Sequence, residues 1–282
     1  MPFTRSILAR RVLCAGIVLG SGAAGAADGD DLEAVVAKPG ASAGWEGAIG
    51  LLVAHRPAYS GADSALTKFT PGFFLRRGRF SITNASGFVA RRADDVSRGI
   101  GVQLFDGARI KASVGLRWDN GRRERSSPDL RGLGDISPTA RARFSLGAEL
   151  GGPFRLGLGI NSDLFGRGGG YIADLSLGWS HRLTPATVVS ANVGASFAGD
   201  RYLQTWYGIT PEQSTRSGRP VYEPPAGWRD VSAGVGFSTE LSRDWLLIGG
   251  AGASRLLGPA ARSLLVTAPS GWGVNGGLAW RF

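Results

Sequence analysis

The chain closes with the sequence GWGVNGGLAWRF, residues 271–282, which alternates between two kinds of side chain. The first set is apolar and mostly aromatic, and it comprises Trp272, Val274, Leu278, Trp280 and Phe282. The second set is small or polar and includes Asn275 and Arg281. A period of two residues is that of a β-strand whose two faces meet different environments. The end of the chain is therefore predicted to be a strand with one apolar face.

The aromatic end of this strand carries a second signal. Phe282, preceded by the apolar Trp280 and Leu278, resembles the C-terminal signature of bacterial outer-membrane β-barrels. The resemblance implies that these three residues form the signal read by the barrel assembly machinery. We expect the apolar face to meet lipid, and Asn275 and Arg281 to face the lumen or its rim. The strand should pair with the first strand of the chain to close a barrel.

Composition limits the fold class. The 282 residues suffice for one large β domain, and the 45 glycines would permit disorder. The hydrophobic fraction of 43%, with 8 Trp and 13 Phe, instead indicates a folded chain. The net charge is +10, but the arginines are dispersed rather than clustered, so no nucleic-acid partner is expected.

The first residues have the pattern of a secretory signal peptide, assigned to residues 1–26. Arg5, Arg10 and Arg11 form its charged region, and a short apolar core follows. That core is shorter than the ~20 residues that a spanning helix needs. The small residues before position 27 predict cleavage after Ala26 or Ala27. We expect residues 27–43 to be a flexible periplasmic lead-in and residues 44–282 to be the barrel. The single cysteine, Cys14, falls inside the signal, which leaves no cysteine for disulfides or metal.

Twelve segments have the length and alternation of membrane strands, with ten strands as the alternative count. They are residues 45–55, 68–76, 79–91 with a bulge at 84–87, 97–105, 109–119, 140–150, 154–163, 171–181, 187–198, 228–240, 245–255 and 271–282. Short turns alternate with longer loops, of which 120–139 and 199–227 are the longest. The sequence thus predicts an all-β fold, a transmembrane antiparallel up-and-down β-barrel with the turn and loop pattern of outer-membrane proteins. Its first partners are outer-membrane lipid and lipopolysaccharide.

Charged residues occupy the polar face of several predicted strands. We expect them either to line a narrow conduit or to fill the lumen as a network of ion pairs. The candidates for the lumen lining are Lys111, Arg117, Arg141, Arg143, Glu149, Arg155, Asp174 and Asp230. No spacing of carboxylates or histidines predicts a catalytic metal, and no cofactor is expected.

Several loop stretches share a distinctive order and spacing of residues. They contain Pro57, Tyr59, Gly61, Tyr207, Gly208, Thr210, Gln213, Ser214, Ser217, Gly218, Tyr222, Gly227, Leu257, Gly258 and Ser263. Together these residues resemble the MipA/OmpV family of outer-membrane proteins, named for the MltA-interacting protein, and the resemblance implies a barrel in the Gram-negative outer membrane. Leu264 departs from the family pattern, which usually has proline there.

The resemblance implies a non-enzymatic scaffold that links a periplasmic murein transglycosylase to a penicillin-binding protein, or an adhesin. A narrow channel for small solutes is the first alternative. An outer-membrane lipid hydrolase is the second, because His55 lies close in sequence to Ser60, Asp63 and Ser64. Ser180 and His181 are adjacent on a predicted strand, so they should face opposite sides and form no catalytic pair.

Overall fold

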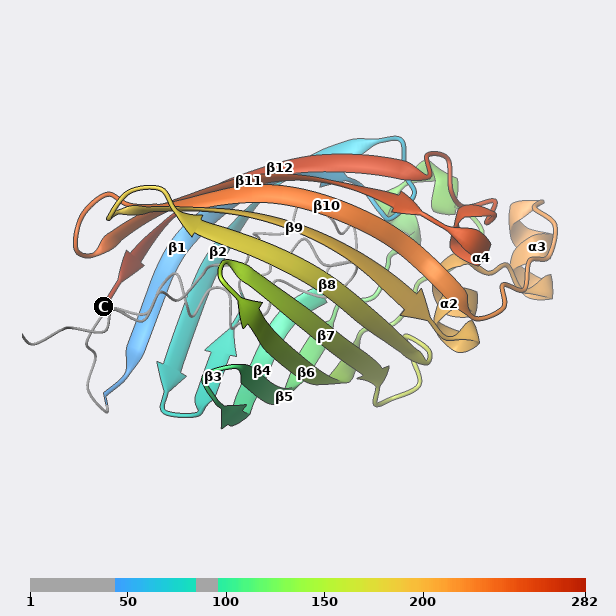
Figure 1. The fold of residues 1–282 in the computed structure, drawn as a ribbon. Coiled ribbons are helices and arrows are strands. Elements are labelled where there is room, and N and C mark those ends of the chain that lie inside the picture. Colours follow the sequence, from blue (N-terminus) through green and yellow to red (C-terminus); the bar gives the residue numbers. More distant parts are fainter. Residues whose placement is uncertain (1–43, 85–95) are drawn as a thin grey trace, which may run out of the picture.

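Twelve antiparallel strands form a closed barrel in the computed structural model, which describes residues 44–84 and 96–282 (Figure 1). Each strand pairs with its neighbours in sequence, and the first pairs with the last. The predicted up-and-down barrel is confirmed, with twelve strands rather than ten. The strands are β1 Glu46–Pro57, β2 Ala65–Arg77, β3 Phe80–Thr83, β4 Val96–Asp106, β5 Ile110–Asp119, β6 Thr139–Gly151, β7 Phe154–Asp163, β8 Tyr171–Arg182, β9 Thr187–Ala198, β10 Gly227–Glu240, β11 Trp245–Leu256 and β12 Ser270–Arg281.

The seam between β1 and β12 closes the barrel as the sequence predicts. Ile49 lies opposite Trp280, and the pairing continues to His55 opposite Val274. Beyond the end of β12, Gly47 and Phe282 exchange two backbone hydrogen bonds, with N···O distances of 3.2 and 3.0 Å. With no unpaired edge at the seam, the backbone polar groups there are satisfied without water, as a membrane requires.

The connections differ at the two ends of the barrel. Five short turns lie at the same end of the barrel as the C-terminus (Figure 1). Some of them contain glycines with positive φ, such as Gly78, Gly151 and Gly152, which allow the chain to turn tightly. The longer loops lie at the opposite end, where Figure 1 also shows the α-helices. In outer-membrane barrels the short turns face the periplasm and the long loops face outward. We name the two ends the periplasmic end and the loop end accordingly.

The loops contain secondary structure that the sequence reading did not predict. Two 3₁₀ turns, η1 Glu124–Ser126 and η2 Pro128–Leu130, lie in the β5–β6 loop. The longest loop folds into α2 Asp200–Tyr207 and α3 Pro211–Ser217, and α4 Gly258–Ala261 follows β11. Within the part of the chain that the structure describes, no helix is long and apolar enough to cross a membrane.

The outer surface of the barrel is apolar, and the inner surface is polar or small. On β8, for example, Leu175 and Leu177 are exposed on the outer face, whereas Asp174 is buried on the inner face. Aromatic residues gather toward the two ends of the strands, as expected for the two membrane interfaces. Those at the loop end are Trp118, Tyr171, Trp228 and Trp272, and those at the periplasmic end are Trp179, Trp245 and Trp280. The faces predicted for the terminal strand are confirmed, with Trp272, Leu278, Trp280 and Phe282 exposed and Arg281 buried.

Three predictions fall wholly or partly outside the described residues. The signal peptide at 1–26 and the lead-in at 27–43 lie outside them entirely. The third predicted strand, 79–91, is described only as β3 Phe80–Thr83, and most of its predicted bulge also lies outside.

Candidate functional site

A layer of buried ion pairs crosses the lumen just below the loop end. Arg141 on β6 donates from Nε to Asp119 Oδ2 on β5 at 2.6 Å, and both side chains are almost fully buried. The same guanidinium donates from Nη2 to the carbonyl of Gly168 at 3.1 Å and lies 5.3 Å from the ring centre of Tyr202. Arg141 therefore joins the barrel wall to the loop that precedes β8 and to helix α2.

A second ion pair sits across the lumen on β10. Arg229 pairs with Asp230, and both residues are 2% exposed. Adjacent residues of a regular strand face opposite sides, but the β9–β10 register shifts between Trp228 and Asp230. This bulge turns both charged side chains inward. Ser196 Oγ donates to Asp230 at 2.9 Å, and Arg229 Nη1 donates to the Tyr202 hydroxyl at 3.1 Å.

Arg143 adds a third group to this layer. Its Nη1 donates to Asn161 Oδ1 at 3.3 Å and lies 4.0 Å from Asp174 Oδ2. Asn161 in turn donates to the same Asp174 oxygen at 3.3 Å. All three side chains are buried. The two charges compensate each other, and Asn161 bonds to both, as buried charges require.

The glycine-rich stretch after β7 wraps around a carboxylate. Asp163 accepts hydrogen bonds from the backbone N–H groups of Phe165, Gly168 and Gly169 at 3.1, 2.7 and 2.8 Å. The Thr139 hydroxyl adds a fourth, at 2.5 Å. These glycines therefore bind a side chain of the same chain, and their amides are not arranged as a site for an external phosphate.

Above the charged layer, the loops pack into an apolar assembly that we call the loop cap. One cluster joins helices α2 and α4 to the strand ends, and comprises Ile172, Ala198, Tyr202, Leu203, Trp206, Tyr207, Leu256 and Ala260. The second joins four loops, and comprises Tyr59, Ala62, Leu130, Leu133, Ile209 and Leu265. Loops normally bury little apolar surface, so the loop cap is an ordered structure and not a set of mobile connections.

Tyr59 ties the first loop of the barrel to the last. Its hydroxyl donates to the carbonyl of Leu265 at 3.0 Å and lies 3.4 Å from Asp129 Oδ2. Burial raises the pKa of the Tyr59 phenol, although a hydrogen bond from Thr267 opposes the shift. The phenol therefore stays protonated and keeps its donor role at neutral pH.

The family-motif residues that the sequence singled out converge on the loop cap. Thr210 caps α3 in a reciprocal pair with Gln213, whose Nε2 donates to the carbonyl of Leu133 at 2.7 Å. Ser214 accepts the closing hydrogen bond of the same helix from Gly218, which adopts a φ of 72°. Ser217 Oγ accepts from the backbone N–H of Arg219, two residues further on, at 3.3 Å.

The remaining motif residues connect α2, α4 and the last loops. Ser263 Oγ donates to the carbonyl of Tyr207 at 2.6 Å, and the Tyr222 hydroxyl donates to that of Pro259 at 2.7 Å. The Gly61 carbonyl accepts from residues 267 and 268. Pro57 and Gly227 lie at strand ends, Gly208 ends α2, and Leu257 and Gly258 begin α4. These residues thus hold the loop cap together.

The predicted lumen lining divides into two zones. Arg117, Arg141, Arg143, Asp174 and Asp230 are buried near the loop end. The ion pairs Lys111–Asp106 and Arg155–Glu149, each with a closest N···O distance of 3.7 Å, lie at the periplasmic end and are partly exposed. The predicted lumen lining did not include Asp119, Asp163, Arg229 or Tyr202. The first two end strands on the inward face, a position that alternation alone could have identified.

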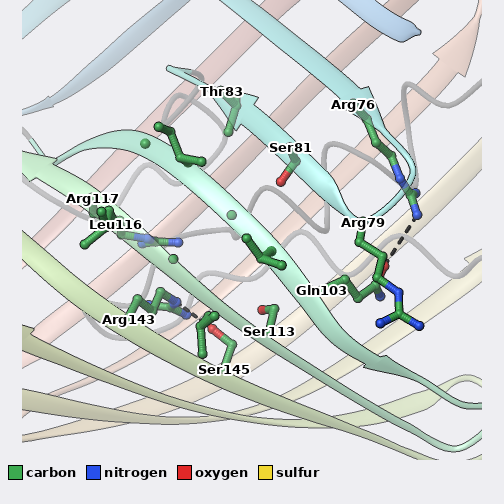
Figure 2. A pocket seen from close by; sticks show the side chains of 16 residues that line it. Arg76, Arg79, Ser81, Thr83, Gln103, Ser113, Leu116, Arg117, Arg143 and Ser145 are labelled. Atoms are coloured by element: carbon green, nitrogen blue, oxygen red, sulfur yellow. Dashed lines mark hydrogen bonds between the residues drawn. The ribbon is translucent and has the colours of Figure 1, made fainter. Parts of the chain in front are cut away.

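A small cavity of about 60 Å³ lies against the inner wall formed by β2–β6 (Figure 2). Figure 2 shows Arg76, Arg79, Arg117 and Arg143 around it, with Ser81, Ser113 and Ser145 between them. Arg143 donates to Ser145 Oγ at 2.7 Å, and Arg76 donates to Gln103 Oε1 at 3.4 Å. The described residues that line it include no carboxylate, so this wall of the lumen is basic.

The two histidines contact threonine and tryptophan side chains. His55 Nδ1 lies 2.9 Å from Thr67 Oγ1, and its ring lies 5.8 Å from that of Trp272. Ser60 Oγ instead accepts from the Tyr207 hydroxyl at 2.9 Å. His181 stacks against Trp179 on the outer face of β8, at 5.9 Å. Among the described residues, no group of three or more His, Cys, Asp or Glu is arranged to hold a metal ion.

A protein-family model matches most of the sequence. The family model described as "MltA-interacting protein MipA" matches residues 49–282. No curated protein matches the sequence.

Similar solved structures include an outer-membrane channel, a porin and a toluene transporter. The COG4313 outer membrane channel from Pseudomonas putida F1 is 11% identical with a TM-score of 0.48, covering 88% of this chain and 98% of its own. The KdgM porin is 7% identical with a TM-score of 0.41, covering 83% and 99%. The Pseudomonas putida toluene transporter TodX is 12% identical with a TM-score of 0.39, covering 90% and 92%. The family match, rather than these structures, bears on function.

Proposed function

Because the chain belongs to the MipA family of MltA-interacting proteins, we propose that this outer-membrane barrel is a scaffold that binds a murein transglycosylase at its periplasmic end. The family description supports the class of partner. In this proposal the barrel has no catalytic role and holds the enzyme near its murein substrate. A penicillin-binding protein is the second partner that the scaffold would bring alongside.

One surface feature supports this site of binding. Exposed arginines occur at four of the five short turns, and we call them the arginine rim: Arg77, Arg79, Arg109, Arg182 and Arg243. Three of the acidic residues nearby, Asp106, Glu149 and Glu240, pair with Lys111, Arg155 and Arg281. A ring of cations at the periplasmic end suits an acidic protein surface, and it would accelerate and orient the encounter.

A direct binding measurement tests the proposal. The barrel is reconstituted in nanodiscs, and its affinity for the MltA-type transglycosylase of the same organism is measured at increasing salt. Changing Arg77, Arg109, Arg182 and Arg243 to Glu should weaken binding at least tenfold and flatten its salt dependence. The matched control changes four exposed loop-end arginines, Arg125, Arg131, Arg201 and Arg216, to Glu. A wild-type barrel that binds no transglycosylase, or equal losses in both variants, would contradict the proposal.

A narrow anion channel is the second candidate function, and the basic wall in Figure 2 favours it. Against it stands the loop cap, whose apolar clusters lie over the charged layer of the lumen. Planar-bilayer recordings of the refolded barrel decide between them. Resolved current steps with a preference for anions would support the channel, and a bilayer without current steps would rule it out.

The lipid hydrolase has the weakest support. A serine hydrolase needs its base within hydrogen-bond reach of the nucleophile, and the printed sequence contains only two histidines. His55 contacts Thr67 and Trp272, and Ser60 contacts Tyr207. We therefore infer a protein without hydrolase activity. An active wild type that loses lipase activity in His55→Ala would overturn this inference.

Export and the outward surface complete the proposal. We propose that residues 1–26 are removed as a signal peptide and that residues 27–43 remain in the periplasm. Mass spectrometry of the outer-membrane form should find its N-terminus at Ala27 or Asp28; an intact Met1 would refute cleavage. The loop cap would then be the surface available for adhesion.

A further inference from the structure

A cavity of about 450 Å³ lies at the loop end of the barrel, apart from the arginine rim, and we call it the loop-end cavity. Its walls come from the β1–β2 loop, the β5–β6 loop, helix α2 and the first residues of β2. Its charged lining consists of Lys68, Arg122 and Arg123, and the described lining residues include no carboxylate. A cleft lined by charges of one sign concentrates ions of the opposite sign. This cavity should therefore gather anions at the loop end.

The loop-end cavity and the small cavity of Figure 2, here called the wall cavity, are bounded by the same strands. Lys68 lines the first and Arg76 lines the second, from positions eight residues apart on the inner face of β2. On β5, Arg117 lines the wall cavity, and Asn120, just past the end of the strand, lines the loop-end cavity. The two cavities therefore lie on the same side of the lumen, at successive levels along the barrel axis.

Positive charge continues along this side of the lumen. The carboxylates near the junction of the two cavities, Asp119 and Asp174, are balanced by Arg141 and Arg143. Pores that pass anions are lined by Arg and Lys at several sites, each weak enough to release the ion to the next. From the loop end to the periplasmic end, the further cations that line the two cavities include Arg123, Lys68, Arg117, Arg76 and Arg79.

We propose that small inorganic anions cross the barrel along this side, entering through the loop-end cavity and leaving past Arg76 and Arg79. In this proposal the loop cap borders the entrance, through Trp206 and Tyr207 of α2, instead of covering it. The wall cavity, at about 60 Å³, has room for only a few water-sized groups, which limits the route to small ions. The inference rests on the anion channel, the second candidate function, and is independent of the scaffold.

Chemical labelling of a single introduced cysteine tests the entrance. The printed sequence contains one cysteine, Cys14, so Lys68→Cys is introduced into a full-length Cys14→Ser chain. Planar-bilayer currents in potassium chloride are recorded before and after addition of a sulfonate-bearing thiol reagent. Labelling should lower the current about twofold or more, because it fills the cavity and reverses its charge. Ser64→Cys is the matched control, since Ser64 is exposed in the β1–β2 loop but does not line the cavity, and its labelling should leave the current unchanged.

Charge reversal tests the selectivity of the same entrance. In a salt gradient, Lys68→Glu and Arg123→Glu should each lower the ratio of chloride to potassium permeability about threefold or more. Because Arg123 is exposed, its variant should fold normally. Arg125→Glu is the control, because Arg125 is exposed two residues further on and does not line the cavity.

The outcomes separate this route from the channel function itself. A wild-type barrel without current steps overturns both. A conducting wild type whose current is unchanged by labelling at position 68, and whose selectivity survives both charge reversals, keeps the channel and refutes this entrance.

Discussion

At the scale of single residues, buried hydrogen-bonded groups connect the barrel wall to the loops. Arg141 contacts a strand neighbour, a loop carbonyl and a helix tyrosine at once. Such a side chain contributes to stability through all its partners, because removing it leaves every partner buried without a hydrogen bond. Single substitutions of these buried groups should therefore lower the free energy of unfolding more than the same substitutions at the periplasmic end.

Arg141→Met tests this comparison. The substitution leaves the carboxylate of Asp119 buried without its cation, and we expect a loss of ~3 kcal/mol in the free energy of unfolding. Urea titration of the refolded barrel in lipid vesicles measures it. Lys111→Met is the control, since its pair with Asp106 is partly exposed and should contribute below ~1 kcal/mol. Equal losses in the two variants would show that the buried pair has no special role.

Ser263→Ala tests a motif residue. Ser263 Oγ donates to the carbonyl of Tyr207 and accepts from the N–H of Leu265, and the residue is buried. Its removal leaves both backbone groups without this partner, at a cost of ~1–3 kcal/mol. Because the bonds join loops, we expect faster proteolysis of the loop cap, with the strands still protected. Ser64→Ala, at an exposed position, should leave the digestion rate unchanged.

At the scale of elements, β1 and β12 approach each other closely through a glycine. A Cβ atom on Gly50 would lie 2.3 Å from the carbonyl oxygen of Leu278 and 2.9 Å from the Cα of Ala279. Both contacts are with backbone, which cannot move without disturbing the ladder. The strand pair that closes the barrel therefore requires a residue without a side chain at this position.

Gly50→Ala should accordingly impair closure of the barrel. We expect a clearly smaller folded fraction, seen as loss of the heat-modifiable band in gel electrophoresis after refolding. Gly276→Ala is the matched control within the same seam, because a Cβ there would meet only the Ile248 carbonyl oxygen, at 3.8 Å. If both variants fold as well as the wild type, the seam tolerates side chains and the steric argument is wrong.

Sequence reasoning predicted the strands well and the loops poorly, for a physical reason. A strand between lipid and lumen must alternate along its whole length, so residues 171–181 show their faces directly. The loop helices are short and receive their stability from contacts across the loop cap, which no local period reveals. One local signal was present: Thr210, Pro211 and Gln213 form a recognisable helix start.

The same contrast applies to the candidate site. Alternation identified Arg141, Arg143 and Asp174 as inward-facing residues. It could not identify Arg229, because a bulge reverses the face of that residue. Nor could it bring Tyr59 to Leu265, since contacts between distant loops follow from barrel closure and not from local sequence.

At the scale of the whole molecule, the loop cap should determine how well the lumen conducts. Replacing residues 200–225 by a short Gly-Ser turn removes α2, which buries Tyr202, Leu203, Trp206 and Tyr207. The strands pair independently of this loop, so we expect a folded barrel with clearly larger single-channel conductance in planar bilayers. As the control, replacing only residues 211–218 removes α3, which buries no residue, and should leave conductance unchanged. Equal conductance in all three proteins would show that the loop cap does not restrict the lumen.

The composition of the loop cap also has a consequence for folding kinetics. Its second cluster unites Tyr59, Leu130, Ile209 and Leu265, so its members are drawn from nearly the full length of the barrel. Contacts between residues this far apart in sequence form late, because the entropy of closing large loops must be overcome first. The second cluster can therefore assemble only after β12 has joined β1, so the time at which it becomes protected from protease reports the final step of barrel closure.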